Sequence, residues 1–188
     1  FAQSALREIT IPSGVTEIGR GAFANCAGLA SISFVGTRNQ DNYLNLGGSA
    51  FMNCTALESV SLPELAADGD GRVVLAGYVF AGCSSLKNID IKNVTEIGVS
   101  AFGACVSLEN ADLKNVTVIG DGAFKDCAKL SNVSGLGKVT DIGDYAFKDT
   151  ALGSVDITGL KNLGAFAFSG TNVSSVKISA GLTSFGGG

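Results

Sequence analysis

Histidine is absent from this chain of 188 residues, and charged residues are scarce. Histidine is the usual general base of enzymes, and the Ser-His-Asp and Cys-His nucleophilic arrangements depend on it. Its absence excludes those arrangements, together with zinc sites that combine cysteine and histidine. Charged residues make up 16% of the chain, below the roughly 25% that is average for soluble domains.

The chain also lacks a basic cluster and a long hydrophobic run. The net charge is −4, whereas nucleic-acid binding depends on basic residues that neutralise phosphates. The longest apolar stretch, residues 73–81, contains Gly77 and is far shorter than the ~20 residues that span a bilayer. We therefore expect no nucleic-acid partner and no membrane insertion by this segment.

Glycine and apolar residues are abundant, and they follow an internal repeat. The segment IGRGAF at residues 18–23 recurs as IGVSAF at 97–102, IGDGAF at 119–124 and IGDYAF at 142–147. One phenylalanine marks each copy: Phe1, Phe23, Phe51, Phe80, Phe102, Phe124, Phe147 and Phe168. The basic spacing is 22 residues, and two longer spacings of 28 and 29 indicate insertions.

Each repeat has the same apolar pattern after its phenylalanine. A leucine follows five or six residues later, and then an alternating pair such as Ile9 and Ile11 predicts a short strand with one buried face. A turn and a second apolar pair spaced by three, such as Val15 and Ile18, complete the unit. One unit cannot bury its own apolar face, so the pattern predicts about eight stacked repeats that cover one another.

The repeat, written I-G-x-x-A-F-x-x-C-x-x-L-x-x-I-x-I-P, resembles the BspA-like (Treponema-type) leucine-rich repeats. Residues 18–34 are the best copy, and the likeness covers essentially all of residues 1–188, with departures at two insertions and at 134–136. It implies an α/β fold, a right-handed leucine-rich-repeat solenoid in which each repeat has a short strand and a turn or short helical segment. It also implies a bacterial or protozoan cell-surface protein, and members with a known role adhere to host matrix proteins or other cells.

The motif residues of this family encode the fold, so the resemblance transfers no binding site to this chain. The pattern starts in mid-repeat at Phe1 and stops in mid-repeat at Gly188. We therefore expect a single leucine-rich-repeat domain over residues 1–188 that is a fragment of a longer extracellular or surface protein.

The five cysteines all lie three residues after a repeat phenylalanine: Cys26, Cys54, Cys83, Cys105 and Cys127. Metal binding, redox chemistry and a chain of disulfides are one set of interpretations. Stacked repeats would hold the Cβ vectors parallel, which disfavours disulfides, and the chain has no C-x-x-C motif. We favour a slot for a small, weakly polar side chain that bonds to a neighbouring turn, and we predict no metal site and no cofactor.

Three aspartates share the outward position between the two strand apolars: Asp90, Asp112 and Asp156. They form either a column of solvent-exposed side chains that only aid solubility, or an acidic strip that binds a ligand on the sheet face, where leucine-rich repeats often bind ligands. Both interpretations stay open. Because the carboxylates are dispersed over repeat surfaces rather than paired for acid–base work, we expect no enzyme.

The two insertions, residues 35–42 and 63–71, enter at the same point of consecutive repeats and should lie side by side on one edge. Loops carry function more often than scaffold does, although long surface loops are also tolerated without a role. The candidate ligand-binding residues here are Arg38, Asn39, Asp41, Glu64, Asp68 and Asp70. The run from Asp68 to Gly71 lacks the third ligand and the distal glutamate of a calcium loop.

These observations predict a cell-surface or secreted binding module. Its partner would be a protein or glycan on a host or neighbouring cell, recognised through the strand face and the paired loops. The alternative is a structural spacer that presents another domain and has no ligand of its own.

Overall fold

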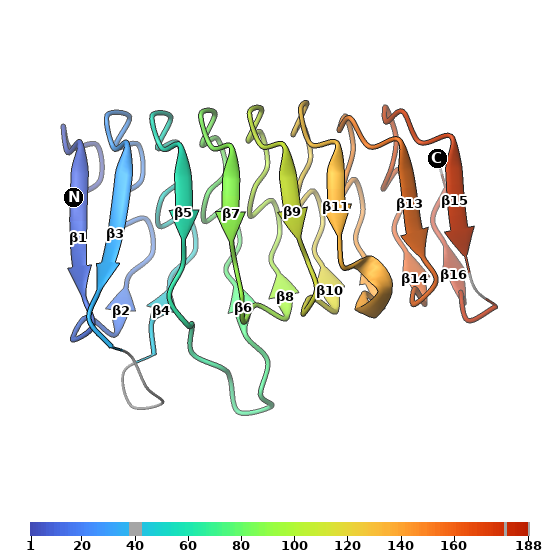
Figure 1. Ribbon diagram of the computed structural model, residues 1–188, viewed down its shortest axis with the longest axis horizontal. Coiled ribbons are helices and arrows are strands. Elements are labelled where there is room, and N and C mark those ends of the chain that lie inside the picture. The colour runs from blue at the N-terminus through green and yellow to red at the C-terminus, as the bar shows by residue number, and fades with distance from the viewer. Residues whose placement is uncertain (38–42, 179, 188) are drawn as a thin grey trace.

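The computed structural model describes residues 1–37, 43–178 and 180–187, and these form a solenoid with two rows of parallel strands (Figure 1). The front row contains β1 (Glu8–Pro12), β3 (Ser31–Val35), β5 (Ser59–Ser61), β7 (Asn88–Asp90), β9 (Asn110–Asp112), β11 (Asn132–Ser134), β13 (Ser154–Ile157) and β15 (Ser175–Ile178). The back row contains β2 (Glu17–Ile18), β4 (Asn45–Leu46), β6 (Val74–Leu75), β8 (Glu96–Ile97), β10 (Val118–Ile119), β12 (Asp141–Ile142), β14 (Asn162–Leu163) and β16 (Ser184–Phe185).

Equivalent residues of neighbouring repeats lie opposite one another in both rows. In the front row Ile9 pairs with Ile32, and in the back row Ile119 pairs with Ile142. The back strands β6 to β16 form one six-stranded sheet, whereas the front strands pair in twos as β1–β3, β5–β7, β9–β11 and β13–β15. The β-branched residues at these positions suit a pleated, half-buried surface, and their buried faces meet between the two rows.

The repeat phenylalanines form a continuous stack along the core. Consecutive rings from Phe1 to Phe168 have centroid distances of 5.2–5.7 Å and interplanar angles of 2–12°. The five rings from Phe51 to Phe147 are fully buried. Each ring therefore covers its neighbours, as the predicted stacking of repeats requires.

The expected helical segments are not found, so the α/β assignment was wrong. Across the described residues the helix is limited to one 3-10 turn, η1 (Leu136–Lys138). The segment around Phe51 shows the reason, because Ser49 and Asn53 have φ values of 58° and 59°, a left-handed conformation that interrupts a right-handed helix. Their N–H groups donate to the next repeat, Ser49 to the Gly77 carbonyl at 3.0 Å and Asn53 to the Ala81 carbonyl at 2.7 Å.

The same two positions, two residues before and after the phenylalanine, are left-handed in seven repeats. The pairs are Gly21 and Asn25, Ser49 and Asn53, Tyr78 and Gly82, Ser100 and Ala104, Gly122 and Asp126, Tyr145 and Asp149, and Phe166 and Gly170. A ladder of hydrogen bonds between repeats thus takes the place of the bonds within a helix. The solenoid consists of strands and turns.

The cysteine slot is confirmed by the contacts of the thiols. Each thiol donates to the carbonyl oxygen of the phenylalanine one repeat earlier at 3.1–3.2 Å: Cys26 to Phe1, Cys54 to Phe23, Cys83 to Phe51, Cys105 to Phe80 and Cys127 to Phe102. All five cysteines are buried and free of disulfides. Burial raises the pKa of Cys54 and Cys127 to about 12 and also raises the pKa of Cys83 and Cys105.

Phe102→Ala tests the stack at a fully buried ring. We expect the free energy of unfolding to fall by about 3–5 kcal/mol, because the change removes buried surface and opens a cavity between two rings. Urea unfolding measures this free energy. Val106→Ala is the control, because Val106 is 41% exposed, and it should lower the free energy of unfolding by less than about 1 kcal/mol. Equal losses in the two variants would contradict the importance of the stack.

The thiols should not react with a disulfide reagent at pH 8 in the native chain, and all five should react after unfolding in guanidinium.

The raised pKa of Cys54, about 12 against an ordinary 9.0, means that the folded chain retains a proton that the unfolded chain loses. This contribution to stability is complete below pH 9 and is lost as the pH rises from 9 towards 12. The alkaline loss of stability should therefore be shallower in Cys54→Ser. Native labelling, or identical pH slopes, would contradict this description.

Candidate functional site

The candidate site lies at the edge where the front strands end and the chain turns towards the back row. At this edge the segment between β5 and β6 projects well beyond the short turns of the later repeats (Figure 1). It contains the second insertion and the predicted residues Glu64, Asp68 and Asp70. The predicted residues Arg38, Asn39 and Asp41 of the first insertion lie outside the described residues.

Backbone pairing joins the segment that follows the first insertion to the second insertion. Leu44 forms a parallel bridge with Leu65, and Ala66 N–H donates to the Leu44 carbonyl at 3.1 Å. Both leucines are buried, so each segment has its own anchor in the core. The chain just after the first insertion therefore runs beside the second insertion.

The Asp68 carboxylate closes the loop on itself. Oδ1 accepts the N–H groups of Asp70 and Arg72, each at 2.9 Å, and Oδ2 accepts Arg72 Nε at 2.9 Å. These bonds, led by the N–H of Arg72, lower the pKa of Asp68. Both oxygens are thus engaged within the turn, and across the described residues no group of three or more acidic, cysteine or histidine side chains is arranged to hold a metal ion.

Arg72 ties this loop to the back row. Its Nη1 lies 3.6 Å from Glu96 Oε1 in β8, and its Nη2 lies 3.8 Å from Asp70 Oδ2. The hydrogen bond to Asp68 is the main cause that raises the pKa of Arg72. The Asp70 side chain is 83% exposed against 35% for Asp68, so Asp70 is the more accessible of the two to a partner.

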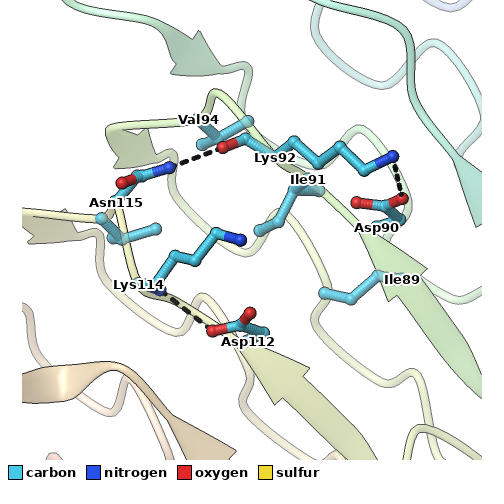
Figure 2. A pocket seen from close by; sticks show the side chains of 9 residues that line it. Ile89, Asp90, Ile91, Lys92, Val94, Asp112, Lys114 and Asn115 are labelled. Atoms are coloured by element: carbon cyan, nitrogen blue, oxygen red, sulfur yellow. Dashed lines mark hydrogen bonds and ion pairs between the residues drawn. The ribbon is translucent and has the colours of Figure 1, made fainter.

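Asp90 and Asp112 line one small hollow between the ends of β7 and β9 (Figure 2). Lys92 Nζ lies 3.1 Å from Asp90 Oδ2, and Lys114 N–H donates to Asp112 Oδ1 at 3.2 Å. The hollow measures about 40 Å³, which is room for water but not for a ligand of many atoms. Its apolar floor is formed by Ile89, Ile91, Val94 and Val116.

The hollow lies at one of the three places where neighbouring front strands form no ladder. No ladder pairing joins β7 to β9, both of which are fully described, and Ala111 is smaller than the isoleucine or valine at the same position in most repeats. Acids and lysines alternate around the opening, so this part of the strand face has mixed charge.

Asp156 lies apart from this hollow, two front strands further along. Its Oδ1 accepts the Thr158 N–H at 3.3 Å, and its Oδ2 lies 3.6 Å from Lys177 Nζ. The bonds from Thr158 are the main cause that lowers its pKa. Ser134 occupies the equivalent position between Asp112 and Asp156, so the three aspartates do not form a continuous strip.

Sequence analysis missed the basic and amide residues of this edge. Lys92, Lys114 and Arg72 provide the positive charges, and Asn93 connects the second insertion to the next turn. The repeated tetrapeptide KNVT at 92–95 and 114–117 was the available signal, because it replaces the turn PSG of the first repeat.

A known family of proteins has the same repeat. The sequence model described as BspA type leucine rich repeat region matches residues 1–73 and 73–188, in six copies. No curated protein matches the chain. Within the described residues, no helix is long and apolar enough to cross a membrane.

Several solved structures have the same fold. A leucine-rich repeat protein of Treponema pallidum is 26% identical, with a TM-score of 0.67 over 87% of this chain and 76% of that one. A leucine rich cell surface protein of Faecalibacterium prausnitzii is 23% identical, with a TM-score of 0.51 over 95% and 62% of the two chains. The pneumococcal vaccine antigen PcpA is 18% identical, with a TM-score of 0.56 over 94% and 51%.

The latter two likenesses, each below 25% identity, establish the fold alone. The family match is of a different kind, because it covers the whole chain and includes the phenylalanine and cysteine positions from which the repeat was derived. The chain belongs to the BspA-type leucine-rich repeat family.

Proposed function

We propose that the chain is one extracellular adhesion domain that captures a protein ligand on a host or neighbouring cell. The edge formed by the second insertion and the turns after β7 and β9 is the proposed contact surface. The observation that carries this proposal is that the longest described loop is fixed beside an exposed surface of mixed charge. The similar chain from Faecalibacterium prausnitzii is a cell surface protein, which supports the extracellular location.

The charges of this edge suit a protein partner. Glu64 and Asp70 are exposed on the loop, while Lys92 and Lys114 are exposed on the turns after β7 and β9. Charges of both signs on one surface favour a partner with the complementary pattern and speed its association. The adjoining hollow of about 40 Å³ is far below the roughly 300 Å³ at which small-molecule pockets begin.

Asn93 holds the loop in place. Its Nδ2 donates to the Leu65 carbonyl at 2.9 Å, and its Oδ1 accepts the Leu65 N–H at 3.2 Å. The side chain therefore pairs with the loop as a neighbouring strand would. A loop fixed in this way loses less conformational entropy on binding, which favours affinity.

Charge removal tests the proposed surface. The variant Glu64→Gln, Asp70→Asn, Lys92→Gln, Lys114→Gln should bind at least roughly tenfold more weakly, about 1.4 kcal/mol, to whichever immobilised matrix protein the native chain captures. The panel is fibronectin, laminin and collagen, measured by biolayer interferometry. The matched control is Glu58→Gln, Lys87→Gln, Glu109→Gln, Lys129→Gln, which removes two acids and two lysines from other exposed positions.

The control should bind within about twofold of the native chain, since these charges lie outside the proposed surface. Equal loss in both variants would contradict the position of the site. Capture of no panel protein by the native chain would contradict the adhesion proposal and favour the alternative of a spacer that presents another domain.

Asn93→Ala should loosen the loop without unfolding the chain. It leaves the backbone groups of Leu65 without their amide partner, at a cost of about 1–2 kcal/mol in the free energy of unfolding. Hydrogen exchange followed by mass spectrometry should show faster exchange at residues 64–72. Asn115→Ala is the control, because Asn115 makes one bond to the Lys92 carbonyl, outside the loop. Unchanged exchange at 64–72 in Asn93→Ala would show that the loop is held by other contacts.

A further inference from the structure

A second surface feature lies on the phenylalanine turns rather than on the strand edge. The position two residues before each repeat phenylalanine points to solvent in several repeats, and it holds Gly21, Ser49, Tyr78, Ser100, Gly122, Tyr145 and Phe166. Tyr78 is 47% exposed, and its neighbours in the column are serines. An aromatic ring therefore stands alone between two small residues.

The fold gives no reason for a tyrosine at this position. Tyr78 has a φ of 59°, a conformation that glycine, asparagine or a small residue adopts at lower cost than a bulky one. Its N–H donates to the Val99 carbonyl at 2.9 Å, a bond that any residue except proline would make. A strained, exposed aromatic that the scaffold does not require points to a role in binding.

Tyr78 forms one wall of a groove of about 310 Å³. Lys125, Asp126 and Asn53 also line it. The other lining residues are chiefly small: Ala81, Gly82, Ser100, Gly103 and Ala104. This volume lies at the lower end of the range for small-molecule sites, and the groove is open to solvent.

The groove exists because two consecutive repeats have no long side chain two residues after the phenylalanine. Other repeats hold asparagine or aspartate there, at Asn25, Asn53, Asp126 and Asp149. Gly82 has no side chain, and the Asn53 side chain lies over it, because a Cβ atom at Gly82 would meet Asn53 Oδ1. The next repeat has alanine at this position, Ala104, and its short side chain leaves the space open.

We propose that this groove binds a neutral pyranose sugar, independently of the proposed protein-binding edge. The ring of Tyr78 offers a flat apolar face, which matches the C–H face of a pyranose, because exposed aromatic rings combine apolar area with little entropy to lose. The ammonium group of Lys125 can donate to sugar hydroxyls, and the carboxylate of Asp126 can accept from them.

The composition of the groove favours a neutral sugar over other partners. Lys125 and Asp126 are adjacent and opposite in charge, so an anionic or cationic ligand gains little. One aromatic ring above a floor of small residues offers far less than the roughly 800 Å² per partner that a standard protein interface buries.

Titration of the ¹⁵N-labelled chain with lactose, cellobiose, maltose and N,N′-diacetylchitobiose tests the proposal. At least one sugar should give saturable shifts at the amides of residues 100–104 and 125–126, with a Kd of about 1–10 mM. Tyr78→Ser and Ala104→Asn should each weaken binding at least roughly tenfold. Both place a residue that the same column holds in other repeats, so the melting temperature should stay the same or rise.

Tyr145→Ser is the matched control, because this ring lies outside the groove and stacks on Phe166 at 5.3 Å. It should leave sugar binding unchanged, and Tyr78→Ser should leave capture of matrix proteins unchanged. Absence of saturable shifts with all four sugars would overturn the proposal. Sugar binding that survives Tyr78→Ser, or shifts at these amides with a matrix protein but with no sugar, would overturn it as well.

Discussion

The contact between one repeat and the next is the interaction on which the whole structure depends. The phenylalanine rings lie 5.2–5.7 Å apart from Phe1 to Phe168, and no repeat could bury its ring without a neighbour. The same stacking brings each cysteine thiol to the carbonyl of the phenylalanine one repeat earlier, as in the bond from Cys105 to Phe80. It also places equivalent strand residues opposite one another. Stability is therefore distributed along the chain as a series of similar interfaces, and the residues that form them are not free to vary for binding.

Both proposed binding surfaces occur where the repeat is altered. At the strand edge an insertion is anchored by Leu65 and Asn93, and the small Ala111 replaces the isoleucine or valine of most repeats. On the turn face a groove opens where Ala104 stands in place of asparagine or aspartate, next to the exposed Tyr78. A regular solenoid thus presents two separate local surfaces without any change in its core, because surface positions are constrained only by the backbone conformation.

The sequence predicted the repeat, the phenylalanine core and the cysteine slot, because each depends on positions that recur at a fixed spacing. It failed on the turn segment, since glycine occupies four of the fourteen left-handed positions named above, and the other residue types do not reveal the conformation. It also failed to separate Asp68, closed in its own turn, from the more exposed Asp70. The role of Asn93 depends on contacts between repeats that only the folded chain displays.

Native-state hydrogen exchange, resolved by residue, tests the central claim most directly. If contacts between repeats hold the fold, the amides of the phenylalanine turns should be protected as strongly as those of the strands. Phe102 N–H, which donates to the Ala123 carbonyl at 2.9 Å, is the reference amide. Protection should be greatest in the central repeats, which are covered on both sides. Rapid exchange at Phe102 and its equivalents beside protected strands would mean that these turns are ordinary loops, and it would contradict the account.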